Sequence, residues 1–179
     1  MMTDYPENST MPANIMFEKW ADIGFEWRGE LSTDELSRLS AQLIQSSLLQ
    51  VTCRLYRAEQ VLWLQYQVDG EVQLACQRCL EPQADTVAGE YRLALLWSED
   101  DVAKINGAEY VLVDEVLTGE GRRLLPIKDL LEDELILALP LSPRHDDCEL
   151  YVDHVGEEIE EEVSDNPFAA LAALKGRLS

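Results

Sequence analysis

Hydrophobic and polar residues alternate along much of the N-terminal half of the chain, as expected for strands that bury one face. Asp69-Gly70 separates two of the alternating runs, and this dipeptide favours a tight hairpin. Four strands are predicted, at residues 48–55, 62–68, 72–76 and 87–97, and residues 110–113 are a candidate addition. The pattern therefore predicts an antiparallel β-sheet of four or more strands.

A period of three to four residues predicts two helices packed with this sheet, which makes the fold class α+β. Ser32 and Glu35 fit a capping box, in which each side chain satisfies a free backbone N–H at the helix start. Its apolar face would be Leu36, Leu39 and Leu43. The second helix spans residues 127–139 and ends at Pro140, which has no N–H to donate. Its apolar face would be Ile127, Leu130, Leu131, Leu135 and Ala138. Residues 15–27 have no clean period and indicate mixed structure.

Composition along the chain suggests one folded domain with appended segments. Glutamates crowd the region before residue 166, and their mutual repulsion predicts a flexible linker. The predicted segments are a disordered N-terminus at 1–13, a single α+β domain at 14–155, an acidic linker at 156–165 and a short C-terminal amphipathic helix at 166–179.

The C-terminal helix has start signals and one apolar edge. Asn166 is a good N-cap and Pro167 suits the first helical position. The apolar edge consists of Phe168, Leu171 and Leu174, which are candidate residues for binding a protein partner. Isolated helices of fewer than about 12 residues are marginal in water. This helix is therefore expected either to fold back on the domain or to dock into a partner groove.

The charge of the chain narrows the classes of partner. With 35 acidic and 14 basic residues, the formal net charge is −21, and the basic residues are scattered. Proteins that bind nucleic acid strongly do so chiefly through clustered Lys and Arg, so direct strong nucleic-acid binding is not expected. The charge either keeps the protein soluble or steers it towards a basic partner. No apolar leader or membrane-length apolar run is evident, which predicts a cytoplasmic protein with no membrane partner.

Three cysteines and a histidine are the clearest candidates for chemistry. Cys76 and Cys79 form a Cys-x-x-Cys pair at the end of a predicted strand, and His145 and Cys148 follow much later. Three sulfurs and one nitrogen are a recognised set of ligands for structural zinc. The His-x-x-Cys half is less diagnostic, so the alternatives are a zinc site and a turn without metal. Thioredoxin-like redox chemistry is disfavoured because nothing predicts a βαβ unit.

No catalytic motif stands out. The chain has no Gly-rich phosphate loop, no Gly-x-Ser-x-Gly elbow and no His-Glu-x-x-His. Asp133 and Glu134 are candidate acid–base residues, but they lie in the second predicted helix, where carboxylates usually face solvent or pair with cations. A non-enzymatic protein is therefore the favoured interpretation.

Several separated motifs resemble those of the bacterial YceD family, whose members are named large ribosomal RNA subunit accumulation proteins. They are Cys76-Gln-Arg-Cys79, the stretch from Asp133 to Pro140 with Pro143-Arg-His145 and Cys148, and Asn166-Pro-Phe-Ala169 with Leu171 and Leu174-Lys175. Gly29 and the helix after Ser32 also fall where the family has a glycine and a helix. The resemblance implies a role in synthesis, processing or accumulation of large-subunit ribosomal RNA, without established catalytic residues.

Charge and resemblance together give the working hypothesis. An acidic protein is repelled by RNA phosphates, so it is expected to act through a basic ribosomal protein or a ribosome assembly factor. Two alternatives remain open. One is a zinc-stapled protein-interaction module of unrelated role, and the other is a metal-dependent RNA-processing enzyme.

Overall fold

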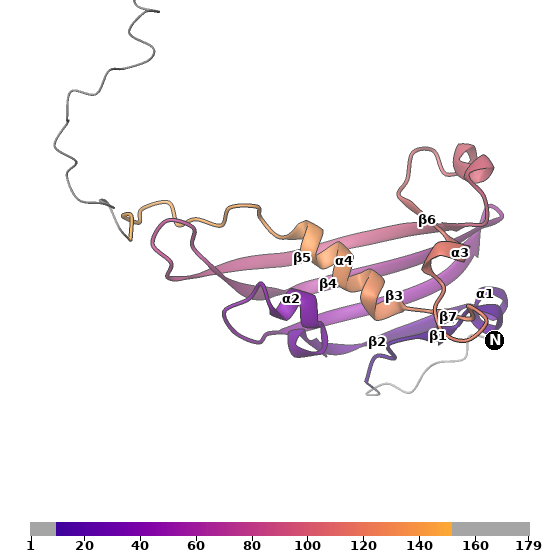
Figure 1. Ribbon diagram of the computed structural model, residues 1–179, viewed down its shortest axis with the longest axis horizontal. Coiled ribbons are helices and arrows are strands. Elements are labelled where there is room, and N and C mark those ends of the chain that lie inside the picture. Colours follow the sequence, from indigo (N-terminus) through magenta and orange to yellow (C-terminus); the bar gives the residue numbers. More distant parts are fainter. Residues whose placement is uncertain (1–9, 152–179) are drawn as a thin grey trace, which may run out of the picture. The chain divides into compact units, whose positions relative to one another are not determined.

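A computed structural model describes residues 10–151 of the chain (Figure 1). Of these, residues 10–149 belong to one compact unit, and the description below concerns that unit. Its main feature is a five-stranded sheet with the order β2-β3-β4-β5-β6. The strands are β2 (Phe25–Ser32), β3 (Leu48–Ala58), β4 (Val61–Ala75), β5 (Pro82–Leu96) and β6 (Tyr110–Leu112). Neighbours pair antiparallel except for β6, which runs parallel to β5. The predicted α+β class is confirmed.

The hairpin predicted at Asp69-Gly70 is wrong, because both residues lie inside the 15-residue strand β4. They pair with Ala88 and Val87 of β5 without a break in register. A Cβ on Gly70 would lie 2.5 Å from Cδ2 of Leu49 on the neighbouring strand. Glycine is therefore needed here for close packing between strands, a strand use of glycine that is distinct from its use in turns.

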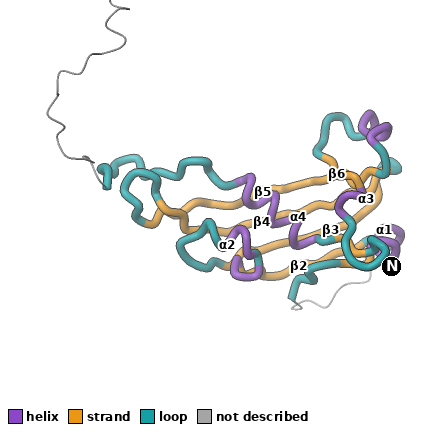
Figure 2. The backbone as a smooth tube through the Cα atoms, in the orientation of Figure 1, coloured by secondary structure: helices purple, strands orange, loops and turns teal. Residues whose placement is uncertain are grey.

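Helices cover one face of the sheet and enclose the main core (Figures 1 and 2). The 12-residue helix α4 (Ile127–Ala138) matches the second predicted helix. Its predicted apolar face is buried except for Ala138, which is exposed, and the adjacent Leu137 is exposed as well. The hydroxyl of Tyr66 on β4 donates to the carbonyl oxygen of Ile127 at 2.6 Å, which ties the helix start to the sheet. The shorter helices are α1 (Phe17–Ile23), α2 (Ser37–Ser40) and α3 (Val113–Val116).

The opposite face of the sheet is mostly polar. Alternate residues of β4 divide between two clusters, because Leu62 and Leu64 join the main core whereas Val61 and Trp63 join a smaller one. The 3₁₀ segment η2 (Glu99–Lys104) adjoins this smaller cluster, to which Ile105 contributes. The guanidinium of Arg92 lies 3.7 Å from the ring centroid of Trp63 beside it.

The N-terminal elements agree with the sequence expectations only in part. Residues 15–27 are mixed, as expected, and include β1 (Ile15–Met16), which pairs with β7 (Leu124–Leu125). The helix predicted after Ser32 is broken into the 3₁₀ turn η1 (Thr33–Glu35) and α2. The break is at Leu36, whose φ of −117° is not helical. The Ser32 hydroxyl caps the N–H of Asp34, so the capping box with Glu35 does not form as predicted.

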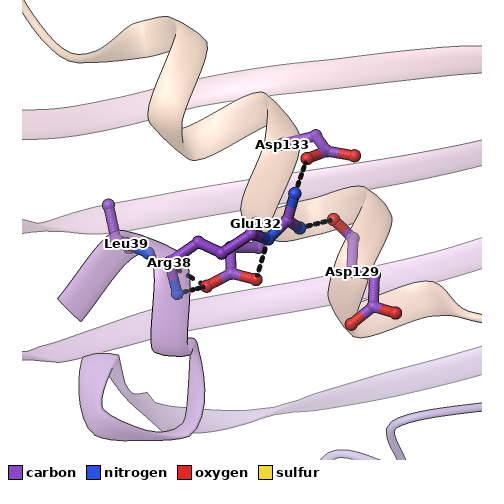
Figure 3. A network of polar contacts seen from close by, with 5 residues as sticks. All are labelled: Arg38, Leu39, Asp129, Glu132 and Asp133. Carbon is purple, nitrogen blue, oxygen red and sulfur yellow. Dashed lines mark hydrogen bonds and ion pairs between the residues drawn. The ribbon is translucent and has the colours of Figure 1, made fainter. Parts of the chain in front are cut away.

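A buried carboxylate on α4 holds α2 in place (Figure 3). Glu132 is only 4% exposed and accepts hydrogen bonds from the backbone N–H groups of Arg38 and Leu39 at 2.5 and 2.9 Å. Its other oxygen accepts from Nε of Arg38 at 2.8 Å. The same guanidinium pairs with Asp133 and donates to the carbonyl oxygen of Asp129. The α2 N-cap residue provides no side-chain bond. Glu132, more than 90 residues later in the sequence, instead accepts from two of the backbone N–H groups that have no partner within this helix.

Some predictions fall outside the described residues. These are residues 1–9 of the expected N-terminal disordered segment, the acidic linker 156–165 and the helix 166–179. Within residues 10–13, Met11 is packed in the core at 2% exposure. Between residues 10 and 151, no helix has the length and apolar character needed to cross a bilayer.

Candidate functional site: a Cys3His cluster

The structure brings together the four predicted metal ligands. Cys76 follows the end of β4, and Cys79 lies in the connection to β5. His145 and Cys148 come from the segment that follows α4. Their ligand atoms all lie within 4.8 Å of one another, although the two halves are 66 to 72 residues apart in the chain.

The first half of the site is a tight turn. The Leu80 N–H donates to the Cys76 carbonyl oxygen at 2.9 Å, and the Cys76 N–H donates to the Glu81 carbonyl oxygen at 3.0 Å. Leu80 has a positive φ of 64°, which lets the chain reverse and enter β5. The Arg78 N–H points at the Cys76 sulfur at 3.4 Å. The turn therefore directs both thiols to one side and supplies a backbone donor to one of them.

The second half is attached to this turn by two polar contacts. The Gln77 N–H donates to the Pro143 carbonyl oxygen at 2.8 Å. The side chain of Arg78 reaches the carbonyl oxygen of Cys148 at 3.0 Å. Both residues between the cysteines of the pair thus hold the segment that carries the other two ligands.

The distances within the cluster suit a tetrahedral ion. Sulfur ligands at about 2.3 Å and nitrogen at about 2.0–2.1 Å from zinc place two sulfurs about 3.8 Å apart and sulfur and nitrogen about 3.6 Å apart. The Cys76 and Cys148 sulfurs are 3.6 Å apart, and the Cys79 sulfur lies 3.4 Å from Nδ1 of His145. Two opposite edges of the tetrahedron therefore already have nearly the required length.

The orientation of His145 supports the same arrangement. Its Nε2 lies 3.2 Å from the carbonyl oxygen of Pro82, the first residue of β5. The tautomer protonated on Nε2 donates to this carbonyl and leaves the Nδ1 lone pair facing the sulfurs. Metal-bound histidines usually make such a second hydrogen bond, which fixes the ring and its tautomer.

The thiols of the cluster differ in acidity. Burial disfavours ionisation of Cys76, but hydrogen bonds from the backbone N–H groups of Cys79 and Arg78 outweigh it and lower the pKa to about 5. Burial raises the pKa of Cys148, and its hydrogen bonds to the neighbouring thiols raise it further. The thiolate form is thus already favoured at Cys76, whereas ionisation of a second thiol such as Cys148 needs a nearby positive charge. A divalent cation would supply that compensation.

The other described candidates, Asp133 and Glu134, are not among the residues that the structure brings together here. Phe168, Leu171 and Leu174 lie outside the described residues. Asp133 pairs with Arg38, and burial raises the pKa of Glu134. Sequence reasoning missed the buried Glu132, for which helical periodicity contained no signal because its partners come from a distant element.

Comparison with known proteins identifies the family. A family model described as Large ribosomal RNA subunit accumulation protein YceD matches residues 64–175. A Haemophilus influenzae protein with the same name is 31% identical over 175 residues, which cover 92% of this chain and 96% of that protein. No solved structure gives a significant match. The family model spans more than half of the chain and the relative nearly all of it, so the chain belongs to the YceD family.

Proposed function

We propose that this protein supports synthesis, processing or accumulation of large-subunit ribosomal RNA in the cytoplasm. The observation that carries the proposal is the family match over residues 64–175, together with a named relative that aligns along nearly the whole chain. The family description names an accumulation role and no catalytic activity.

A non-enzymatic role fits the chemistry of the candidate site. Catalytic zinc keeps one coordination position open for water or substrate, whereas structural zinc is closed by four protein ligands. Cys76, Cys79, His145 and Cys148 provide four ligand atoms, which would leave no open position. The Cys3His cluster is thus suited to holding the β4–β5 connection and the segment after α4 together. We propose that it does so by binding a structural zinc ion.

The proposed partner is a basic ribosomal protein or a ribosome assembly factor. The net charge of −21 repels RNA phosphates and attracts cationic polypeptides. Binding a basic protein would shield it from premature contact with RNA or deliver it to the assembling subunit. Ribosomal RNA would then be affected indirectly.

A binding experiment tests this partner class. Full-length protein is titrated with individually purified basic ribosomal proteins at several NaCl concentrations. At least one should bind, and its affinity should fall as salt rises, because the attraction is between opposite charges. Salt-independent binding, or binding to none of them, would contradict the proposal.

A cellular experiment tests the role itself. In cells that lack the endogenous protein, we expect less large-subunit than small-subunit ribosomal RNA, with the ratio restored by the wild-type gene. An unchanged ratio would contradict the proposed role. Cleavage of precursor RNA by pure protein and Mg²⁺, abolished by substitution of a carboxylate in the folded unit, would instead show an enzyme.

A further inference from the structure

The outer edge of β5 is open for most of its length. One side of this strand pairs with β4 from Pro82 to Leu95. The other side pairs with β6 only at residues 94–96. Among residues 10–151, no strand pairs with the part of this edge that precedes residue 94. Unpaired strand edges offer a row of backbone donors and acceptors to another extended chain.

The backbone groups on this edge can be identified residue by residue. The Ala94 N–H donates to the Glu109 carbonyl oxygen, so the backbone N–H and C=O groups of Ala94 point away from β4. The Pro82 carbonyl oxygen contacts His145, so this carbonyl group also points away from β4. Register with β4 is continuous between these residues, and backbone direction alternates along a strand. The residues whose N–H and C=O groups point outward are therefore Ala84, Thr86, Ala88, Glu90 and Arg92, and all five are exposed.

The start of this edge borders a cavity of about 580 Å³ that is broadly open to solvent. One wall consists of Gln83 and Ala84, and the other is the segment 144–148, which carries half of the Cys3His cluster. Gln83 also has a buried side-chain oxygen, which has no hydrogen-bond partner within the described part of the chain. The site thus has open backbone groups beside an unsatisfied acceptor.

The charges around the edge favour a basic occupant. Asp85 and Glu90 lie on the strand, and Asp146 and Asp147 line the cavity, whereas the basic residues are Arg92 and Arg144. A second copy of this chain would bring another net charge of −21 to the same place, which opposes edge-to-edge dimers. An extended basic segment would be attracted to this edge, whereas a second copy of the chain would be repelled from it.

We propose that the outer edge of β5, from Ala84 to Arg92, binds an extended basic segment of a partner protein as an added β-strand. This inference rests on the proposed function, because it specifies how the basic partner is held. Main-chain hydrogen bonds would supply affinity with little demand on sequence, and the acidic groups would select for positive charge.

Amide hydrogen exchange of the full-length protein tests the binding mode. The probe is a synthetic peptide of about ten residues in which lysine and valine alternate. Exchange at Ala84, Thr86, Ala88, Glu90 and Arg92 should slow about tenfold or more at saturation, and exchange in β2 should not change. A glutamate–valine peptide is the charge control. Equal slowing by both peptides, or no slowing in β5, would overturn the proposal.

A pair of variants at one position tests the backbone contact. Ala88→Pro removes an outward N–H without removing a bond to β4, and we expect the peptide to bind about tenfold more weakly. Ala88→Val keeps the N–H, so its affinity should stay near that of the wild type. If Ala88→Pro folds, as judged by circular dichroism, and binds normally, the edge is not the site. If it does not fold, the exchange pattern of the wild type decides.

Other occupants of the edge would be recognised by the same measurements. Concentration-dependent protection of β5 without peptide would indicate a second copy, and faster β5 exchange on deletion of residues 152–179 would indicate the chain's own tail. Either result would overturn the proposal. Salt-dependent binding of a ribosomal protein with unchanged β5 exchange would remove this inference and leave the proposed function standing. If the peptide protects β5 but no ribosomal protein binds, the proposed partner class would be wrong and the binding mode of this edge would stand.

Discussion

Glu132 illustrates how one residue can connect elements that are far apart in the sequence. Burial of a carboxylate disfavours its ionised form, but hydrogen bonds from the Leu39 N–H and the Arg38 side chain outweigh this and lower its pKa. The ionised group stabilises the native state because the unfolded chain offers no such donors. Its contribution is fully present above the ordinary glutamate pKa and is lost as pH falls through the lowered value.

We predict that Glu132→Gln destabilises the protein at pH 7 by about 1–3 kcal/mol, because the charge-assisted hydrogen bonds to Arg38 and Leu39 weaken. The difference from wild type should shrink as pH falls below about 4.3, where Glu132 of the unfolded chain becomes protonated, and it should vanish below the lowered pKa of the folded group. Urea unfolding at pH 7 and at pH values below 4.3 measures both effects. Asp133→Asn, which removes an exposed pair with Arg38, is the control and should cost less than about 1 kcal/mol. A pH-independent difference for Glu132→Gln would contradict the explanation.

At the scale of elements, hydrophobic periodicity correctly predicted the helices and strands that bury one regular face of a single segment. The helix at 127–139 and the alternation around the buried Cys53 agree with the structure, since both depend on a regular pattern facing a core. The continuous β4 was missed because Asp69-Gly70 has turn chemistry, while the contact of Gly70 with Leu49 is between strands. The break at Leu36 was missed because α2 is capped by a distant helix.

Gly70→Ala tests whether close packing explains that glycine. The new Cβ would lie 2.5 Å from the side chain of Leu49 and 3.3 Å from the backbone of Leu48, so we expect a destabilisation of about 1–3 kcal/mol. Gly89→Ala in β5 is a matched control, since its Cβ would meet only the ring end of Tyr91 at 3.3 Å. Chemical denaturation compares the two. A cost at Gly70 no larger than at Gly89 would contradict this role.

The Cys3His cluster was recognisable in the sequence as four residue types, but only the fold shows that the two halves meet. We predict stoichiometric zinc in protein purified without chelator, and loss of most of it in Cys79→Ser. Cys53→Ala is the control, because Cys53 is buried in the core and should leave the zinc content unchanged. Metal analysis by mass spectrometry checks this prediction. Less than one zinc per four chains in the wild type would count decisively against a zinc site.

For the whole molecule, charge is the dominant property. With a net charge of −21, folding brings like charges closer together, and this repulsion opposes the compact state. We therefore predict that Tm rises as NaCl increases from about 0.01 M to about 0.15 M, over which the Debye length falls from about 30 Å to about 8 Å. Differential scanning calorimetry measures the shift. A Tm that stays constant or falls would indicate that attractive ion pairs, such as Arg54 with Glu26, outweigh the repulsion.

With the proposed zinc ion in the Cys3His cluster, the stability of this protein would depend on the supply of metal. An ion that binds only the folded chain adds a free energy that grows with the logarithm of its free concentration. The melting temperature measured for one preparation would then depend on the trace metal carried by the buffer. In a growing cell, the amount of folded protein would depend on the zinc supply, so zinc starvation would lower the production of ribosomes.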